Sequence, residues 1–167
     1  MAQLDGLRIT WRRVAPEADR REVAWGLLRE LAGDVAIANP CPFCGGPHGP
    51  VQLPGSPWRA SVAYAGNLAV VGVIPVGAAD SFGVDAEQGD AQSGDLRAWT
   101  RVEAALKADG RGIRVDPASV RVTEDGEGWT AAVPGPRDDG DRIYRGWDAA
   151  APAGVVISVA ARGSGRR

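Results

Sequence analysis

The chain has 167 residues and a net charge of −2, a length that fits one domain with a sizeable core. The nearly balanced charge gives no support for a nucleic acid or an acidic membrane as a partner. No apolar stretch reaches the roughly 18 residues of a membrane-spanning helix, and residues 1–10 lack the apolar region of a signal peptide. We therefore expect a cytoplasmic protein that binds neither nucleic acid nor membrane.

In the first part of the chain, hydrophobic periodicity predicts a strand, a helix, a long loop and two more strands. The helix has leucines on one stripe and a glycine after its last turn, which is a typical stop. The loop is dense in proline and glycine, which favours an ordered but irregular segment. The expected ranges are 7–13, 17–32, 39–57, 59–64 and 67–76.

The second part predicts one helix set among strands. Asp95 is a good N-cap residue for this helix, and Trp99 lies on its apolar stripe, so we expect Trp99 to pack inward. Turn-forming Asp-Gly and Pro-Gly sequences separate the later strands. The predicted strands are 82–87, 119–123, 128–133, 142–147 and 154–160, with a polar linker at 88–95 and the helix at 96–108.

Three carboxylates and a lysine stand at informative spacings around the linker. Asp85 and Glu87 are two residues apart on a predicted strand, so they point to one face, while Glu103 and Lys107 share a helical face at i, i+4. Mg²⁺ is commonly held by one or two carboxylates plus phosphates and waters, and an ammonium can hold a phosphate. The pattern indicates Mg²⁺-dependent phosphoryl-type transfer. The ordinary alternative is a pair of solvated acids and an i, i+4 ion pair.

Several motifs in one order resemble the 4′-phosphopantetheinyl transferase superfamily, in its larger monomeric branch. Residues 82–87 read Phe-Gly-Val-Asp-Ala-Glu, and residues 99–104 read Trp-Thr-Arg-Val-Glu-Ala, followed by Lys107 and a Gly-Arg-Gly sequence at 110–112. Residues 41–49, Cys-Pro-Phe-Cys-Gly-Gly-Pro-His-Gly, are similar to a segment that many bacterial members carry before the core strands. The resemblance covers about residues 12–160.

The resemblance implies an α+β fold built as a pseudo-twofold pair of similar halves with antiparallel sheets. It would be a single domain over residues 1–161, with halves at about 1–90 and 91–161. It also implies a monomer. We expect residues 162–167 to form a disordered tail.

The implied activity is the Mg²⁺-dependent transfer of 4′-phosphopantetheine from coenzyme A to a serine of an acyl- or peptidyl-carrier protein, the holo-acyl-carrier-protein synthase reaction. By position, Asp85, Glu87 and Glu103 would hold Mg²⁺, which requires the carboxylates to converge within about 5 Å. Glu103 or a metal-bound water would accept the serine proton, and Lys107 would contact phosphate.

Coenzyme A would be held by further residues outside the acidic motif. The resemblance implies that Arg20 and Arg21 bind its 3′-phosphate and that His48 touches the coenzyme.

The chain also departs from the family pattern at several coenzyme A contacts. Pro50 stands where a basic residue follows the His-Gly pair, Ala63 and Tyr64 replace a serine and a histidine, and Val102 replaces a lysine. The linker after Glu87 is shorter than usual. These departures favour an alternative, a non-catalytic relative that binds a carrier protein or a nucleotide.

Cys41, Cys44 and His48 have C-x₂-C-x₃-H spacing, which could supply three zinc ligands. A four-coordinate site would then need a carboxylate or a water as well. A zinc-stabilised interaction module is thus another alternative. The ordinary interpretation is a glycine-rich turn with small thiols, which suits a reducing compartment.

Overall fold

The computed structural model describes residues 4–163, without the side chains of residues 113 and 138. Two α-helices, eight strands and three short 3₁₀ turns form this part of the chain. Their bounds in chain order are β1 Arg8–Arg13, α1 Arg20–Ala32, β2 Trp58–Ala65, β3 Leu68–Pro75, β4 Ser81–Gln88, α2 Gly94–Asp109, η1 Gly112–Arg114, η2 Pro117–Ser119, β5 Arg121–Glu124, β6 Trp129–Pro134, η3 Pro136–Asp138, β7 Asp141–Ala149 and β8 Val155–Arg162.

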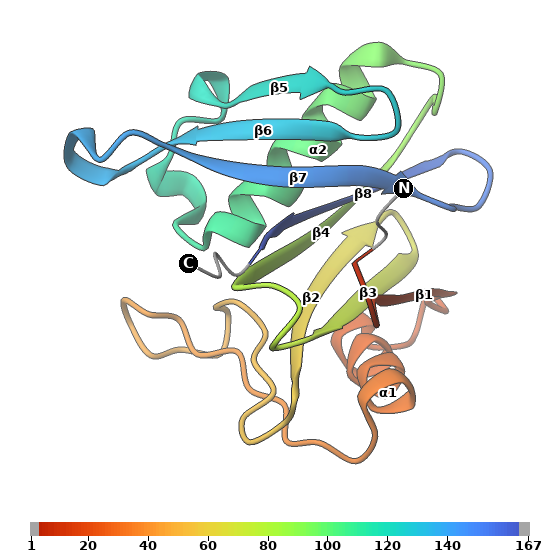
Figure 1. Ribbon diagram of the computed structural model, residues 1–167. Helices are drawn as coiled ribbons and strands as arrows, with labels where there is room; N and C mark the ends of the chain where they lie inside the picture. The colour runs from red at the N-terminus through yellow and green to blue at the C-terminus, as the bar shows by residue number, and fades with distance from the viewer. Residues whose placement is uncertain (1–3, 164–167) are drawn as a thin grey trace.

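The strands form two antiparallel sheets, one with the order β1-β3-β2 and one with the order β4-β8-β7-β6-β5 (Figure 1). The predicted α+β class with antiparallel sheets is confirmed. The chain passes from the first sheet to the second at residues 76–80, whereas the sequence suggested a division near residue 90. The reason is that β4 pairs with β8 over its whole length and so belongs to the second sheet.

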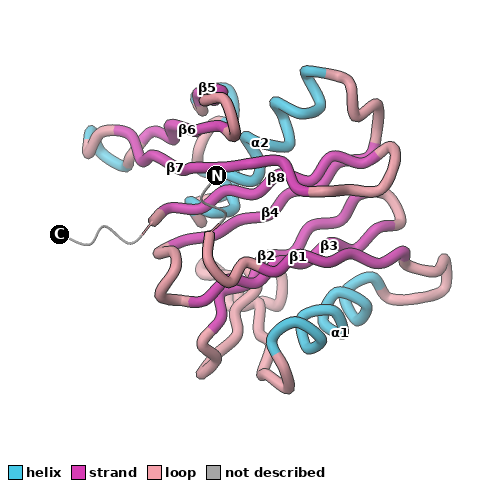
Figure 2. Tube along the Cα trace, turned by 45° about the vertical axis from the view of Figure 1, so that its right-hand side comes forward, coloured by secondary structure: helices cyan, strands magenta, loops and turns pink. Residues whose placement is uncertain are grey.

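The two sheets lie between the two helices, so that α1, the three-stranded sheet, the five-stranded sheet and α2 follow one another as layers (Figures 1 and 2). One apolar cluster fills the space between the sheets, a second lies beneath α1, and a third lies beneath α2. Period-2 alternation explains this, because each strand sends alternate side chains to opposite faces.

The same order of connection occurs twice. In β1-α1-β2-β3 the last strand pairs between the first and the third, and in β4-α2-β7-β8 the last strand again pairs between its first and third partners. The hairpin β5–β6 is added at the edge of the second sheet. The two halves therefore share a topology although the sequence contains no strong repeat.

Strand β4 is held between the opposite sheet and α2. Phe82 and Val84 face the core between the sheets, while Gly83 faces α2. A Cβ atom on Gly83 would lie 2.3 Å from the carbonyl oxygen of Ala104 and 2.4 Å from the backbone nitrogen of Ala108. Only glycine fits there, and the close approach brings Asp85, on the same face, against the helix.

Both helices end as the sequence predicts, but one cap differs. Gly33 (φ 87°) and Gly110 (φ 83°) end α1 and α2 in conformations that favour glycine. The predicted N-cap Asp95 is wrong: the Ser93 side chain accepts the Leu96 N–H, and the helix begins at Gly94. Asp95 lies in the first turn, where its charge suits the helix dipole.

The predicted tail begins one residue too early, because Arg162 is still part of β8, where it pairs with Ser81. Residues 164–167 lie outside the described part of the chain. Within residues 4–163, no helix combines the length and the apolar character needed to cross a membrane.

Candidate functional site

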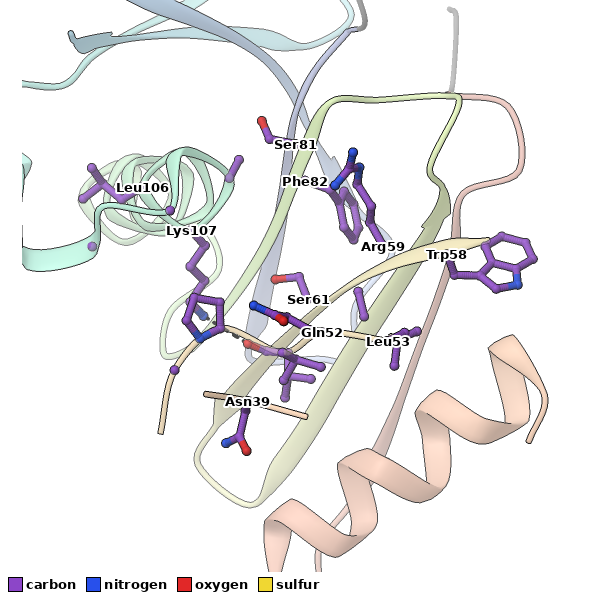
Figure 3. Close-up of a pocket in the computed structure, with 18 of the residues that line it drawn as sticks. Asn39, Gln52, Leu53, Trp58, Arg59, Ser61, Ser81, Phe82, Leu106 and Lys107 are labelled. Carbon is purple, nitrogen blue, oxygen red and sulfur yellow. Dashed lines mark hydrogen bonds between the residues drawn. The ribbon is translucent and has the colours of Figure 1, made fainter. Parts of the chain in front are cut away.

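A cleft of about 910 Å³ lies along β2, the end of α2 and the long loop between α1 and β2. Figure 3 shows Lys107 on one side of this cleft and Asn39, Gln52 and Ser61 on the other. We call residues 103–110 with β4 the helix wall and residues 39–57 the loop wall. The two walls come from different halves of the sequence.

In the helix wall, Lys107 pairs with Asp85 across the gap between α2 and β4. The Lys107 Nζ atom donates to Asp85 Oδ1 at 2.7 Å and also reaches the Val62 carbonyl oxygen at 3.4 Å. Asp85 is only 6% exposed. The i, i+4 ion pair with Glu103 is thus not the contact that Lys107 makes here; its partner comes from the neighbouring strand.

The second oxygen of Asp85, Oδ2, is buried and has no hydrogen-bond partner within residues 4–163. Glu103 lines the cleft nearby. Burial raises the pKa of the Glu103 carboxyl, the negative charges of Asp85 and Glu87 raise it further, and Lys107 offsets part of this effect. The carboxylates of Asp85 and Glu87 and the ammonium of Lys107 are therefore close enough to act on Glu103.

Glu87 accepts a hydrogen bond from Trp99 Nε1 at 3.2 Å. Trp99 is 45% exposed, so the prediction that it packs inward is wrong. The inner face of α2 carries Thr100, Ala104 and Ala108 instead. Small side chains are required there because β4 approaches the helix closely at Gly83.

The three predicted metal carboxylates, Asp85, Glu87 and Glu103, lie on β4 and α2. A compact group of possible metal ligands in the described part of the chain is Cys41, Cys44 and His48, whose ligand atoms all lie within 4.8 Å of one another. Asp85, Glu87 and Glu103 are near enough to influence one another electrostatically. Their role as joint Mg²⁺ ligands stays a prediction.

The arginines of α1 have two different positions. Arg21 lines the cleft, whereas the Arg20 guanidinium lies 4.6 Å from the centre of the Tyr64 ring. Burial raises the pKa of the Tyr64 hydroxyl, and the positive charges of Arg20 and Arg21 oppose this. Tyr64 also lines the cleft.

Sequence reasoning missed polar residues of β2 that line the cleft. Arg59 Nε donates to the Ala79 carbonyl at 2.8 Å, and Ser61 Oγ accepts the Val84 N–H at 2.9 Å. The first contact joins β2 to the connection at residues 76–80, and the second joins β2 to β4. Strand alternation could have placed Arg59 and Ser61 on one face, but no motif marked them.

In the loop wall, the thiols and the imidazole converge. Cys44 Sγ and His48 Nε2 are 2.9 Å apart, and both cysteines are free. Hydrogen bonds from the backbone N–H groups of Cys44 and Phe43 lower the pKa of the Cys41 thiol. His48 lines the cleft, so this cluster borders the space that Lys107 and Glu103 face from the other side.

Comparison of the sequence with known protein families and with curated proteins gives no match.

Proposed function

We propose that the protein transfers 4′-phosphopantetheine from coenzyme A to a serine of an acyl- or peptidyl-carrier protein. The observation that carries this proposal is the helix wall, in which Glu103 and Lys107 line one large cleft and the buried Asp85 pairs with Lys107 and acts on the charge of Glu103. Such a grouping suits a reaction at a phosphate.

The size and charge of the cleft support a large ligand that carries phosphates. Its volume of about 910 Å³ is near the upper end of the ligand pockets found in proteins, roughly 300–1,000 Å³. Three cationic side chains, Arg21, Arg59 and Lys107, line it. Arginine forks and the lysine ammonium are the usual protein partners of phosphate oxygens.

In the proposed reaction the serine hydroxyl of the carrier protein attacks the β-phosphorus of coenzyme A. A new O–P bond forms, the bond from phosphorus to 3′,5′-ADP breaks, and Glu103 accepts the hydroxyl proton. A carboxyl with a raised pKa is a better proton acceptor than an ordinary one near neutral pH. Lys107 would balance charge that grows on the phosphate oxygens.

The donor set also fits Mg²⁺ if only one or two of the carboxylates bind it. Carboxylate oxygens are the ligands that Mg²⁺ prefers, and the remaining positions normally go to phosphates and waters. Asp85 Oδ2 is a buried oxygen without a hydrogen-bond donor in the described residues, and Glu103 or Glu87 would supply the second ligand. When bound, the ion would add charge neutralisation at the phosphates.

The repeated topology gives further support. The superfamily that the sequence resembles is expected to have a fold of two similar halves. In this protein, β1-α1-β2-β3 and β4-α2-β7-β8 follow one pattern of connection. The cleft is lined by residues from both halves.

A second candidate is a protein that binds a nucleotide-like ligand or a carrier protein without transferring a group. It is favoured by the contact of Lys107 with Asp85 Oδ1, which places an ammonium on one of the proposed metal ligands. Tyr64 stands where the resembling family pattern has a histidine, and this difference also favours the second candidate. A phenol has no positive charge to offer a phosphate.

Intact-mass spectrometry of an apo carrier protein incubated with this protein, coenzyme A and Mg²⁺ tests the proposal. We expect the carrier to gain the mass of one phosphopantetheine group, and we expect Asp85→Asn and Glu103→Gln to abolish the gain. Asp95→Asn, which removes an exposed acid of the same helix, is the matched control and should retain activity.

Two negative outcomes have different meanings. If several carrier proteins stay unmodified while calorimetry detects coenzyme A binding, the non-catalytic alternative holds. If coenzyme A does not bind either, both functions are wrong.

A further inference from the structure

We infer that Cys41, Cys44 and His48 bind one Zn²⁺ ion, which fixes the shape of the loop wall. The Sγ and imidazole nitrogen atoms of the three residues lie within 4.8 Å of one another. Two thiolates and an imidazole form a donor set that selects zinc over magnesium or calcium. The site is separate from the carboxylates of the helix wall and does not depend on the transfer reaction.

The backbone around the cysteines is already folded for metal binding. Gly45 donates its N–H to the Cys41 carbonyl at 2.9 Å and has φ 71°, a conformation that favours glycine. The Gly46 N–H donates to Cys44 Sγ at 3.4 Å. An amide hydrogen directed at the Cys44 sulfur stabilises the thiolate, the form in which cysteine binds a metal.

The distances leave room for an ion after a small movement. With Zn–S near 2.3 Å and Zn–N near 2.0–2.1 Å, tetrahedral ligands lie about 3.5 Å apart. The present separation of 2.9 Å between Cys44 Sγ and His48 Nε2 would lengthen by about 0.6 Å when the hydrogen bond is replaced by two metal bonds. Three protein ligands leave the fourth position to a water.

The zinc site and the cleft share His48, and the residues next to it are tightly constrained. The Gly49 N–H donates to the Asn39 carbonyl at 2.7 Å, and a Cβ on Gly49 would lie 2.0 Å from the Pro40 carbonyl oxygen. His48 and Gly49 both line the cleft. An ion that holds His48 to Cys41 and Cys44 would therefore also fix this part of the wall.

The test is a metal titration of the full chain, stripped with a chelator and kept reduced. Co²⁺ is added first, because thiolate ligands and tetrahedral geometry give it characteristic absorption bands, and Zn²⁺ should then displace it at one ion per chain. We expect Cys41→Ser, Cys44→Ser and His48→Asn each to weaken zinc binding by at least about 100-fold. Phe43→Leu changes a residue between the cysteines and keeps all three ligands, so it should change zinc affinity by less than about threefold.

Hydrogen exchange adds a second readout, in which Zn²⁺ should slow exchange in residues 39–57 of the wild type but not of His48→Asn. His48 is exposed, so its replacement is expected to leave the fold intact even if a cysteine variant folds poorly. A folded, reduced wild type that gives no thiolate–cobalt bands would overturn the inference. Equal zinc affinity in the wild type and in His48→Asn would overturn it as well.

Discussion

Two aspartates with buried side chains, Asp109 in α2 and Asp85 on the adjacent strand β4, differ in the hydrogen bonds that their carboxylate oxygens accept. Asp109, whose side chain is fully buried, accepts hydrogen bonds from Arg111, Arg142 and Tyr144. Asp85 has one partner, Lys107, and its Oδ2 atom has none in the described part of the chain. Buried polar groups are normally paired, so an unpaired oxygen needs a reason. We interpret Asp109 as a structural residue and Asp85 as a binding residue.

The largest effect expected is on stability when Asp109 is replaced. Asp109→Ala leaves the cations of Arg111 and Arg142 without their buried partner and should lower the free energy of unfolding by about 3–5 kcal/mol. Urea unfolding would measure it. Asp85→Asn is the comparison and should cost less than about 1.5 kcal/mol, because Asp85 has one side-chain partner, Lys107, whereas Asp109 has three. Equal losses would remove the distinction between the two aspartates.

The same pair predicts an acid response. Burial alone would raise the pKa of Asp109, but hydrogen bonds from Arg111 and Tyr144 outweigh it and hold the pKa below its usual 3.8. A carboxyl whose pKa is lower in the folded than in the unfolded protein stabilises the fold when the pH is above the unfolded-state pKa. This stabilisation is lost as the pH falls through the folded-state pKa. The stability advantage of the wild type over Asp109→Asn should therefore be complete above about pH 4 and decline below it.

The second effect concerns the close packing that brings Asp85 to α2. Gly83→Ala would push a methyl group into the Ala104 carbonyl and the Ala108 nitrogen, and we expect a loss of about 3 kcal/mol in unfolding free energy. Gly77→Ala, where a Cβ atom meets nothing within 4 Å, is the control. If both variants unfold at the same urea concentration, β4 does not lie as close to α2 as described.

A smaller effect is expected from Mg²⁺. If Asp85 Oδ2 is a ligand, 10 mM Mg²⁺ with a dissociation constant of about 1 mM should stabilise the wild type by about 1.4 kcal/mol. Asp85→Asn should lose this stabilisation, and Asp109→Asn should keep it. Thermal unfolding with and without the ion would show the difference, and the absence of any Mg²⁺ effect on the wild type would argue against the site.

The smallest effect comes from Glu103. Burial and the charges of Asp85 and Glu87 raise the pKa of Glu103 in the folded protein. Its contribution to stability is therefore greatest when the pH is below the unfolded-state pKa near 4.5. It is lost as the pH rises through the higher folded-state pKa. As the pH rises from 4 to 7, the unfolding free energy of Glu103→Gln should therefore increase relative to that of the wild type, by less than about 1 kcal/mol. Denaturant unfolding at the two pH values tests this, and a relative loss would give the opposite sign.

Much of this fold could be predicted from local patterns in the sequence. Strand alternation and the leucine stripe gave the elements of both halves, and glycine gave both helix ends. The partner of Lys107 could not be predicted in this way, because Asp85 belongs to another element and the contact depends on how close β4 comes to α2. The prediction that Trp99 packs inward was wrong for the same reason, because the narrow gap between α2 and β4 admits only small side chains.

The parts of the candidate site that lie within one short segment could be predicted from the sequence, and the parts that depend on contacts between segments could not. Cys41, Cys44 and His48 lie within eight residues, and their convergence follows from one turn. Whether Asp85, Glu87 and Glu103 converge depends on the packing of a helix on a strand, so their role as joint Mg²⁺ ligands stays a prediction. Arg59 and Ser61 enter the cleft because the two sheets meet at β2 and β4, which no single segment encodes.

The central claim is that the helix wall and the loop wall form one site for a phosphate-bearing ligand. Hydrogen–deuterium exchange with and without coenzyme A and Mg²⁺ tests it most directly. We predict slower exchange in both residues 39–57 and residues 99–110, with no change in the hairpin β5–β6. Protection of neither wall at saturating coenzyme A, or protection confined to the hairpin, would contradict the account.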